Sequence, residues 1–160
     1  MAEELHISQG TKADKYELLY KQIAEVVKYE SDSIALMANI SAMIHQTFGF
    51  WWTGFYRVIG NELVLAPFQG PMACTRIAYG KGVCGTAWQR GESVVVEDVE
   101  QFPGHIACSS LSRSEIVVPV KNKDNDIVAV LDIDSEHLAT FDEVDRLYLE
   151  KIATLLGSLL

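Results

Sequence analysis

The sequence predicts an α+β domain in which helices pack against an antiparallel sheet. Its 160 residues, of which 49% are hydrophobic and 22% charged, match one ordinary soluble domain. Apolar residues recur at helical spacing over about the first fifty positions and again near the C-terminus. Between these regions they alternate with polar residues, as in strands. Because helices and strands occupy separate stretches, an antiparallel sheet is expected rather than alternating βαβ units.

The chain begins with two predicted helices. The first carries an apolar stripe over residues 16–27, and residues 1–14 ahead of it are expected to form a mobile segment. Ser31 or Ser33 can cap the second helix, and Gly49 ends it. Both helices therefore precede any strand.

The middle of the chain predicts strands. Residues 53–59 and 62–68 form a hairpin, because Gly60 and Asn61 between them make a typical two-residue turn. Further strands are expected at 73–77, 93–97, 115–120 and 127–133. Pro119 lacks a backbone N–H, so its strand has an edge or a bulge at that point. A meandering antiparallel sheet follows from this order.

The last predicted helix begins near Phe141, where Thr140 and Glu143 fit a capping box. Its apolar stripe over 144–159 is unusually wide, which predicts contacts with more than one partner. The segment 80–114 fits neither a simple strand nor a simple helix pattern. Long irregular segments in compact domains tend to carry function, so this segment is a candidate for the functional site.

The net charge of −9 opposes binding to nucleic acid or to an anionic membrane surface. The N-terminus lacks the basic start and apolar core of a signal peptide, and no apolar run approaches the length of a membrane span. We therefore expect a cytoplasmic protein with neither nucleic acid nor membrane as a partner.

The chain has three cysteines, Cys74, Cys84 and Cys108, which cannot all pair with one another. A reducing cytosol would keep them as thiols at rest. Each could be a small buried hydrophobic residue, or the set could carry redox chemistry. A zinc site formed by these thiols with His105 has weak support, because the only close pair is His105-x-x-Cys108. No metal is expected.

Residues 80–85 spell G-x-G-x-x-G, which resembles a dinucleotide-binding motif. That motif needs a crossover helix and a second parallel strand, whereas residues 86–89 allow barely one helical turn. No nicotinamide or flavin cofactor is therefore expected. The glycines more simply permit a tight loop that brings Cys84 close to other backbone.

Carboxylates are predicted to gather at one end of the sheet. Asp132 and Asp134 are two residues apart on one strand and so face the same side. If the last two strands pair as a hairpin, Glu115 lies close to both. A solvated strand end would explain the pattern equally well. Cys108 precedes Glu115 by seven residues and enters on the same loop, which favours a functional cluster.

A thiol beside several acids is less reactive, because negative charge raises the thiol pKa. Such a site works if a cationic substrate neutralises the acids, or if one acid stays protonated and donates a proton. Both conditions indicate a small substrate that carries an amine, and an acid-assisted reaction.

Five segments, taken in order, resemble the free methionine (R)-sulfoxide reductases, which are enzymes built on a single GAF domain. The segments are FQGPMAC at 68–74, GKGVCGTA at 80–87, FPGHIAC at 102–108, SEIVVP at 114–119 and VLDIDS at 130–135. They include all three cysteines in the expected relative positions. Ser109 departs from the pattern, since many members carry an aspartate after the catalytic cysteine.

The resemblance implies a single GAF domain over residues 1–160. Such a domain has a six-stranded antiparallel sheet, with helices packed on one face and long loops closing a small pocket on the other. It also implies a homodimer that needs no cofactor and that uses thioredoxin as its reductant.

The resemblance also implies roles for particular residues. Cys108 is the expected nucleophile, Cys74 the resolving thiol, and Cys84 an additional thiol for disulfide exchange. The expected substrate-binding residues are Trp52, Glu115, Asp132 and Asp134.

The implied reaction converts free L-methionine (R)-S-oxide to methionine through a cysteine sulfenic acid and an intramolecular disulfide. Two other functions are considered: a GAF sensor that binds a small ligand without catalysis, and a thiol redox switch. A switch alone would not need the acid cluster or Trp52, and a phosphate-bearing ligand would be repelled by the acids.

Overall fold

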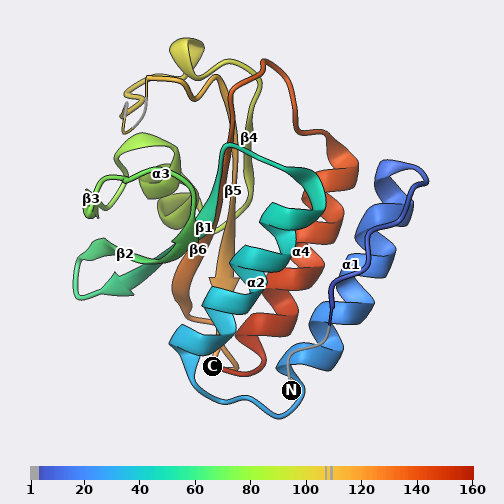
Figure 1. Ribbon diagram of the computed structural model, residues 1–160. Helices are drawn as coiled ribbons and strands as arrows, with labels where there is room; N and C mark the ends of the chain where they lie inside the picture. Colours follow the sequence, from blue (N-terminus) through green and yellow to red (C-terminus); the bar gives the residue numbers. More distant parts are fainter. Residues whose placement is uncertain (1–3, 107, 109) are drawn as a thin grey trace.

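The computed structural model describes residues 4–106, 108 and 110–160, and it has the predicted α+β architecture (Figure 1). Its elements, in chain order, are α1 (Lys12–Val27), α2 (Ser33–Phe48), β1 (Trp52–Ile59), β2 (Glu62–Gln69), β3 (Arg76–Ala78), α3 (Gly82–Arg90), β4 (Val94–Val96), a 3-10 turn (Val99–Gln101), β5 (Ser114–Lys121), β6 (Ile127–Ser135) and α4 (Glu143–Gly157).

Within the described residues, six strands form one antiparallel sheet in the order β3-β2-β1-β6-β5-β4. The two predicted hairpins, β1–β2 and β5–β6, are confirmed. A simple meander is wrong, however, because the first and last strands pair at the centre, with Trp52 opposite Asp134. This pairing joins the two hairpins and brings the aromatic start of β1 to the acidic end of β6.

The two faces of the sheet differ in what covers them. Helices α1, α2 and α4 lie on one side of the sheet and α3 on the other (Figure 1). Alternation along β6 follows this division: Leu131 and Ile133 belong to the core under the helices, whereas Val130 belongs to a second core beneath α3. Asp132, between the two helix-facing residues, must therefore face the α3 side.

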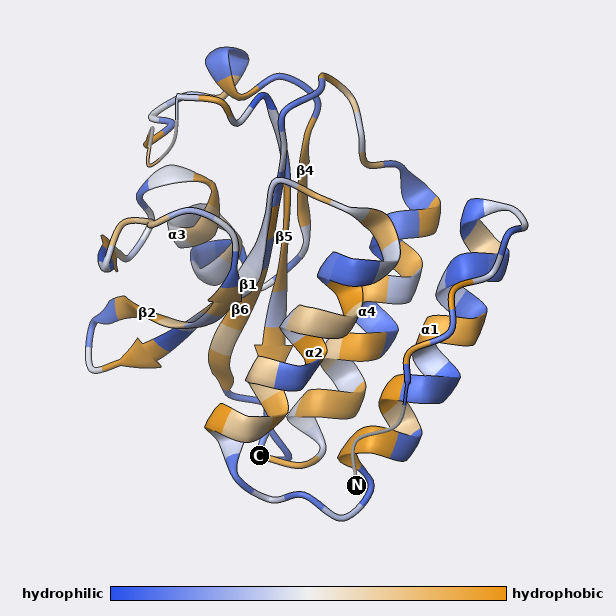
Figure 2. Ribbon diagram, viewed as in Figure 1, coloured by the Kyte–Doolittle hydropathy of each residue, from blue (hydrophilic) through white to orange (hydrophobic). Residues whose placement is uncertain are grey.

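The wide apolar stripe of α4 is accounted for within the chain. Helix α4 packs on β5 and also contacts α1. Apolar and polar residues alternate along α4 in Figure 2, as expected of a helix with a buried side. Tyr16 of α1 stacks on Tyr148 of α4 at 5.3 Å between ring centroids. Its hydroxyl donates to buried Asp145 at 2.6 Å. The predicted contact with more than one partner is confirmed, and both partners belong to this chain.

Two predicted helix caps are wrong. Asp32, rather than Ser31 or Ser33, caps α2 by accepting from the N–H of Ala35 at 2.9 Å. Gly49 ends α2 as predicted, in a left-handed conformation with φ 67°. Several residues near the start of α2 could cap it, and the one that does so is an aspartate.

At the start of α4, Asp142 and Asp145 form the capping box, not Thr140 and Glu143. Thr140 instead hydrogen bonds with Ser135 at 2.6 Å between the two hydroxyls. The helix therefore begins two residues later than the sequence indicates.

The edges of the sheet also depart from the predicted strand ranges. Strands β3 and β4 are each three residues long. Strand β4 pairs with β5 only as far as Val117, so β5 is an edge strand at Pro119, as predicted. Helix α3 begins at Gly82 and runs for nine residues, longer than the single turn that the sequence suggested.

Residues 12–14 of the N-terminal segment belong to α1, which Thr11 caps. Ahead of them, the backbone N–H of His6 donates to Gln22 of α1 at 2.8 Å. The mobility of 1–14 stays a prediction. In the part of the chain that the structure describes, no helix is long and apolar enough to cross a membrane.

Replacing Leu131 with alanine should destabilise the fold strongly, because Leu131 is 0% exposed at the centre of the core under the helices. We expect a loss of about 2–5 kcal/mol in the free energy of unfolding, measured by urea denaturation. Leu138→Ala is the matched control, since Leu138 is 46% exposed and should change stability by less than about 0.5 kcal/mol. Equal losses in the two variants would contradict the assignment of this core.

Candidate active site

A small cavity of about 50 Å³ lies on the α3 side of the sheet. It is lined by the start of β1, the loop after β2, the beginning of α3, the loop before β5, the start of β5 and the end of β6. Its lining includes six of the seven residues that the sequence predicts for the site: Trp52, Cys84, Cys108, Glu115, Asp132 and Asp134. The seventh, Cys74, reaches the cavity wall through its bond to Cys108.

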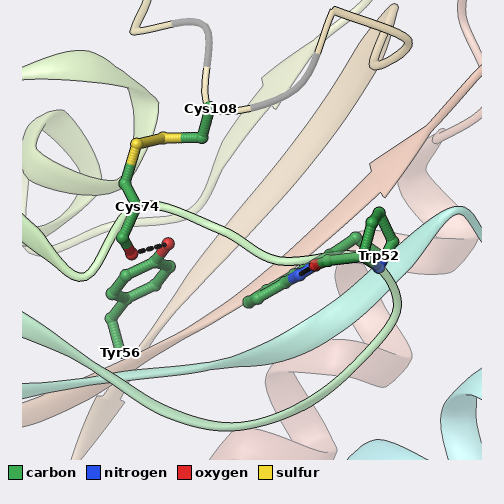
Figure 3. Close-up of a disulfide and its surroundings, with 5 residues drawn as sticks. Trp52, Tyr56, Cys74 and Cys108 are labelled. Carbon is green, nitrogen blue, oxygen red and sulfur yellow. Dashed lines mark hydrogen bonds between the residues drawn. A yellow bond between two sulfur atoms is a disulfide. The ribbon is translucent and has the colours of Figure 1, made fainter.

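Cys74 and Cys108 are joined by a disulfide, with 5.4 Å between their Cα atoms (Figure 3). This separation lies within the ordinary range for disulfides. Cys74 lies on the loop between β2 and β3, and the hydroxyl of Tyr56 on β1 donates to its carbonyl at 2.9 Å. The sequence predicts thiols at rest in a reducing cytosol, whereas the structure presents the oxidised state. The half-buried disulfide forms one wall of the cavity.

The acid cluster forms as the hairpin predicts. Glu115 pairs directly with Asp134, and Asp132 lies two residues before Asp134 on the same face of β6. Glu115 is 6% exposed and Asp132 is 5% exposed. A solvated strand end is therefore excluded for these two residues, and their carboxyl groups face the cavity.

Burial is the main cause of the raised pKa values in this cluster. It raises the pKa of Glu115 and of Asp134 well above their usual ranges, and the negative charge of Asp132 adds to both effects. Burial also raises the pKa of Asp132 to about 6, although hydrogen bonding with Glu115 and Cys84 opposes this rise. No lysine or arginine is among the described residues that line the cavity. The cluster therefore holds protons that exposed carboxyl groups would release.

Cys84 lies in α3 and is buried against the same acids. Burial raises the pKa of its thiol well above the ordinary value, and the charges of Asp132 and Glu115 raise it further. Both effects favour the neutral thiol of Cys84 over its thiolate. The glycine pattern predicted that Cys84 lies close to other backbone, but nothing in the sequence predicted that it lies beside Asp132.

Trp52 is held in place from several sides. Its indole N–H donates to the carbonyl of Pro71 at 3.0 Å, and its ring stacks on Phe68 at 5.1 Å and Tyr56 at 5.9 Å between centroids. The ring is therefore a fixed aromatic part of the cavity wall, beside Asp134 on the neighbouring strand. Trp51 also lines the cavity.

Tyr56 and Ser112 are among the cavity residues that the sequence analysis missed. Tyr56 lies four residues after Trp52 on the same strand, so strand periodicity places both on one face and could have revealed it. Ser112 donates to Asp134 at 3.3 Å from the irregular loop before β5, where no periodic pattern exists to find it. Ser109, the departure from the family pattern, lies outside the described residues.

The cofactor interpretations can be tested against the geometry. The glycine motif at 80–85 leads into α3 and then into β4, which pairs antiparallel with β5, so the parallel crossover of a dinucleotide-binding fold is not formed. The disulfide uses two of the sulfurs in the zinc set considered from the sequence, Cys74 and Cys108. A different set lies together: the ligand atoms of Cys84, Glu115 and Asp132 are all within 4.8 Å of one another.

A model of the GAF domain family matches residues 36–160. The chain belongs to the GAF domain family. This GAF domain is 56% identical over 99% of its length to GAF domain-containing protein A of Dictyostelium discoideum, whose whole length is covered. It is 41% identical to the free methionine-R-sulfoxide reductase of Escherichia coli, covering 93% of this chain and 90% of that protein.

A solved structure shows the same relationship. The crystal structure of free methionine-R-sulfoxide reductase from Neisseria meningitidis, in complex with its substrate, superposes on this GAF domain with a TM-score of 0.95 at 54% identity. The match covers 98% of this chain and 94% of that one. The resemblance drawn from the five sequence segments is confirmed, as is the GAF fold that it implied.

The stability of this GAF domain should depend on the ionisation of Asp132. Burial lifts the pKa of Asp132 to about 6 in the folded protein, whereas an unfolded chain has a value of about 4. The stabilising proton is fully present below about pH 4 and is lost as the pH rises through about 6. We therefore expect the free energy of unfolding to fall more between about pH 4.5 and about pH 7.5 in the parent protein than in Asp132→Asn.

Urea denaturation at both pH values measures this difference. Asp126→Asn, in the exposed turn between β5 and β6, is the control and should keep the parent's pH dependence. An identical pH dependence in Asp132→Asn and the parent would show that Asp132 has no raised pKa.

Proposed function

We propose that this protein is an oxidoreductase that reduces free L-methionine (R)-S-oxide to methionine. The observation that carries the proposal is the placement of the Cys74–Cys108 disulfide on a cavity that also holds buried acids and a fixed tryptophan. The similarity to proteins named free methionine-R-sulfoxide reductase, including one solved in complex with its substrate, supports the same conclusion.

Cys108 is the proposed nucleophile. A sulfoxide oxygen is a poor leaving group until it is protonated, and a well-placed acid contributes about 10²–10⁴-fold to such a step. Glu115 or Asp134 supplies this proton, because burial raises the pKa of both and keeps them protonated. The Cys108 sulfur takes the oxygen and becomes a sulfenic acid, while the sulfoxide sulfur is reduced to the thioether of methionine.

Cys74 is the proposed resolving thiol. Its sulfur attacks the sulfenic acid of Cys108, forming the disulfide and releasing water. An external dithiol, thioredoxin by family resemblance, then reduces the disulfide by exchange and returns both thiols. Cys84 is an additional thiol for this exchange. Neither a metal nor an organic cofactor enters this cycle.

Recognition of the free amino acid follows from charge. Its ammonium group balances carboxylates that have no other cationic neighbour among the described lining residues. Methionine within a polypeptide lacks this ammonium group, and a cavity of about 50 Å³ suits a small molecule better than a continuing chain. Trp52 provides an apolar surface for the methyl group of the sulfoxide. Specificity for the R epimer is proposed from the family alone.

The assembly and location of the protein are proposed from the same resemblance. A homodimer is expected, although the apolar stripe of α4 already has partners within the chain and no longer argues for it. A cytoplasmic location is expected because the cycle needs a reducing dithiol donor.

A panel of substrates tests the proposed reaction. With dithiothreitol as reductant, we expect turnover of free methionine R-sulfoxide but not of the S epimer or of a peptide-bound sulfoxide. Cys108→Ser should abolish turnover while keeping the parent's circular dichroism spectrum, because a serine hydroxyl cannot take the oxygen. Activity that survives in Cys108→Ser would overturn the mechanism. Tight binding of the sulfoxide without turnover in the parent would favour the sensor function instead.

Replacing Cys74 with serine separates the two halves of the cycle. The Cys74→Ser variant should still release one methionine per chain in a single turnover, since Cys108 acts first. It should then fail to be recycled by thioredoxin, and mass spectrometry should find an oxidised Cys108. Steady turnover with thioredoxin in this variant would show that Cys84, or no resolving thiol at all, completes the cycle.

A further inference from the structure

The proposed cycle uses Cys84 only as an additional thiol and gives no reason for its place among the buried acids. Its sulfur, one oxygen of Glu115 and one oxygen of Asp132 lie within 4.8 Å of one another. The three side chains come from α3, β5 and β6, so tertiary packing rather than sequence spacing brings them together. All three are buried.

A second observation indicates that Asp132 can accept a further ligand. The Oδ1 atom of Asp132 is buried and has no hydrogen-bond partner among the described residues. Buried polar atoms are normally satisfied, and an unsatisfied carboxylate oxygen is costly. Asp132 is 5% exposed and lines the cavity, so a ligand that reaches this oxygen must enter there.

We propose that Cys84, Glu115 and Asp132 form a binding site for a thiophilic divalent cation such as Zn²⁺. One sulfur and two carboxylate oxygens suit zinc, which accepts both kinds of ligand in a four-coordinate site. Magnesium and calcium prefer sites built from oxygen alone. With three ligands from the protein, a fourth position is left for water or another group in the cavity, as in zinc sites that exchange ligands.

This site differs from the zinc set considered from the sequence. That set needs Cys74 and Cys108, which are joined in the disulfide. The site proposed here needs neither of them. It is therefore complete in the oxidised protein, and its occupation does not depend on any turnover.

Occupation of the site would have one consequence that rests on the proposed function. Glu115 and Asp132 are also proposed to hold the substrate, so a cation bound there excludes the substrate. A thiophilic metal would then act as a competitive inhibitor of the reductase.

Cobalt absorbance tests the site directly. In the oxidised protein, two of the three cysteines form the disulfide, so Cys84 is the thiol available to a metal. Titration with Co²⁺ should produce thiolate-to-cobalt charge-transfer absorption that saturates at one ion per chain. Zn²⁺ should then displace the Co²⁺ and remove the absorption.

Variants distinguish this site from adventitious binding. Cys84→Ser should lose the absorption, and both Cys84→Ser and Asp132→Asn should weaken Zn²⁺ binding by at least about tenfold in a competition with a chromophoric chelator. Glu100→Gln, which removes an exposed carboxylate that does not line the cavity, should bind Zn²⁺ like the parent. Absence of the cobalt absorption in the parent, or unchanged Zn²⁺ affinity in Asp132→Asn, would overturn the proposal.

The outcome does not depend on the proposed reaction, because the oxidised protein performs no turnover during the titration. Asp132→Asn keeps Cys84 and nearly the same shape, so it tests the site even if Cys84→Ser fails to fold. Inhibition is measured separately with pre-reduced protein in a single turnover without added thiol. An inactive parent protein would contradict the proposed function and leave the cobalt result as it stands.

Discussion

The site depends on one constraint: buried Glu115 and Asp132 and half-buried Asp134 are held side by side without a neighbouring cation among the described lining residues. Carboxylates in such a position can lower their energy by keeping protons or by binding a positive ligand. Burial raises the pKa of all three groups. The cluster is therefore at once a store of protons for acid catalysis and an attractive site for a cation.

The fold keeps this unfavourable arrangement in place through the other face of the sheet. Leu131 and Ile133 anchor β6 in the core under the helices, while the acids between and beyond them face the cavity. A shift of one residue in the pairing would reverse every side chain, which the apolar core opposes. Stability on one face thus positions reactive groups on the other. The disulfide and Trp52 then complete the walls of the cavity.

The same electrostatic argument connects the proposed substrate and the proposed metal. An ammonium group and a divalent cation both balance the acid cluster, but only the metal also binds sulfur strongly. Cys84, whose burial favours the neutral thiol, is the residue that separates the two cases. Catalysis would therefore follow when the substrate occupies the cavity, and inhibition when a divalent cation occupies it.

Much of this arrangement could be predicted from the sequence, because it rests on local periodicity. The spacing of Asp132 and Asp134 and the hairpin with Glu115 follow from strand alternation, and the structure confirms both. The pairing of Cys74 with Cys108 spans 34 residues, and spacing alone offers no preference among three thiols. The sequence predicted this pairing only through the resemblance to the reductase family.

Other features were not predictable for physical reasons. Helix α3 contains two glycines, Gly82 and Gly85, and is capped by Gly91, so helix propensity is weak there and tertiary packing decides its length. The contact of Cys84 with the acids depends on that packing. The caps at Asp32 and Asp142 were missed because neighbouring residues are equally competent, and only the backbone geometry selects among them.

The protonation of the acid cluster is the most direct test of this account. Carbon-13 NMR of the labelled side-chain carboxyl carbons, in metal-free oxidised protein, can follow each group through a pH titration, with Glu115→Gln, Asp132→Asn and Asp134→Asn assigning the signals. Asp132 should titrate near about 6, with Glu115 and Asp134 well above their usual ranges. If all of them titrate near about 4, as exposed carboxyl groups do, the cluster holds no stored protons and the account is wrong.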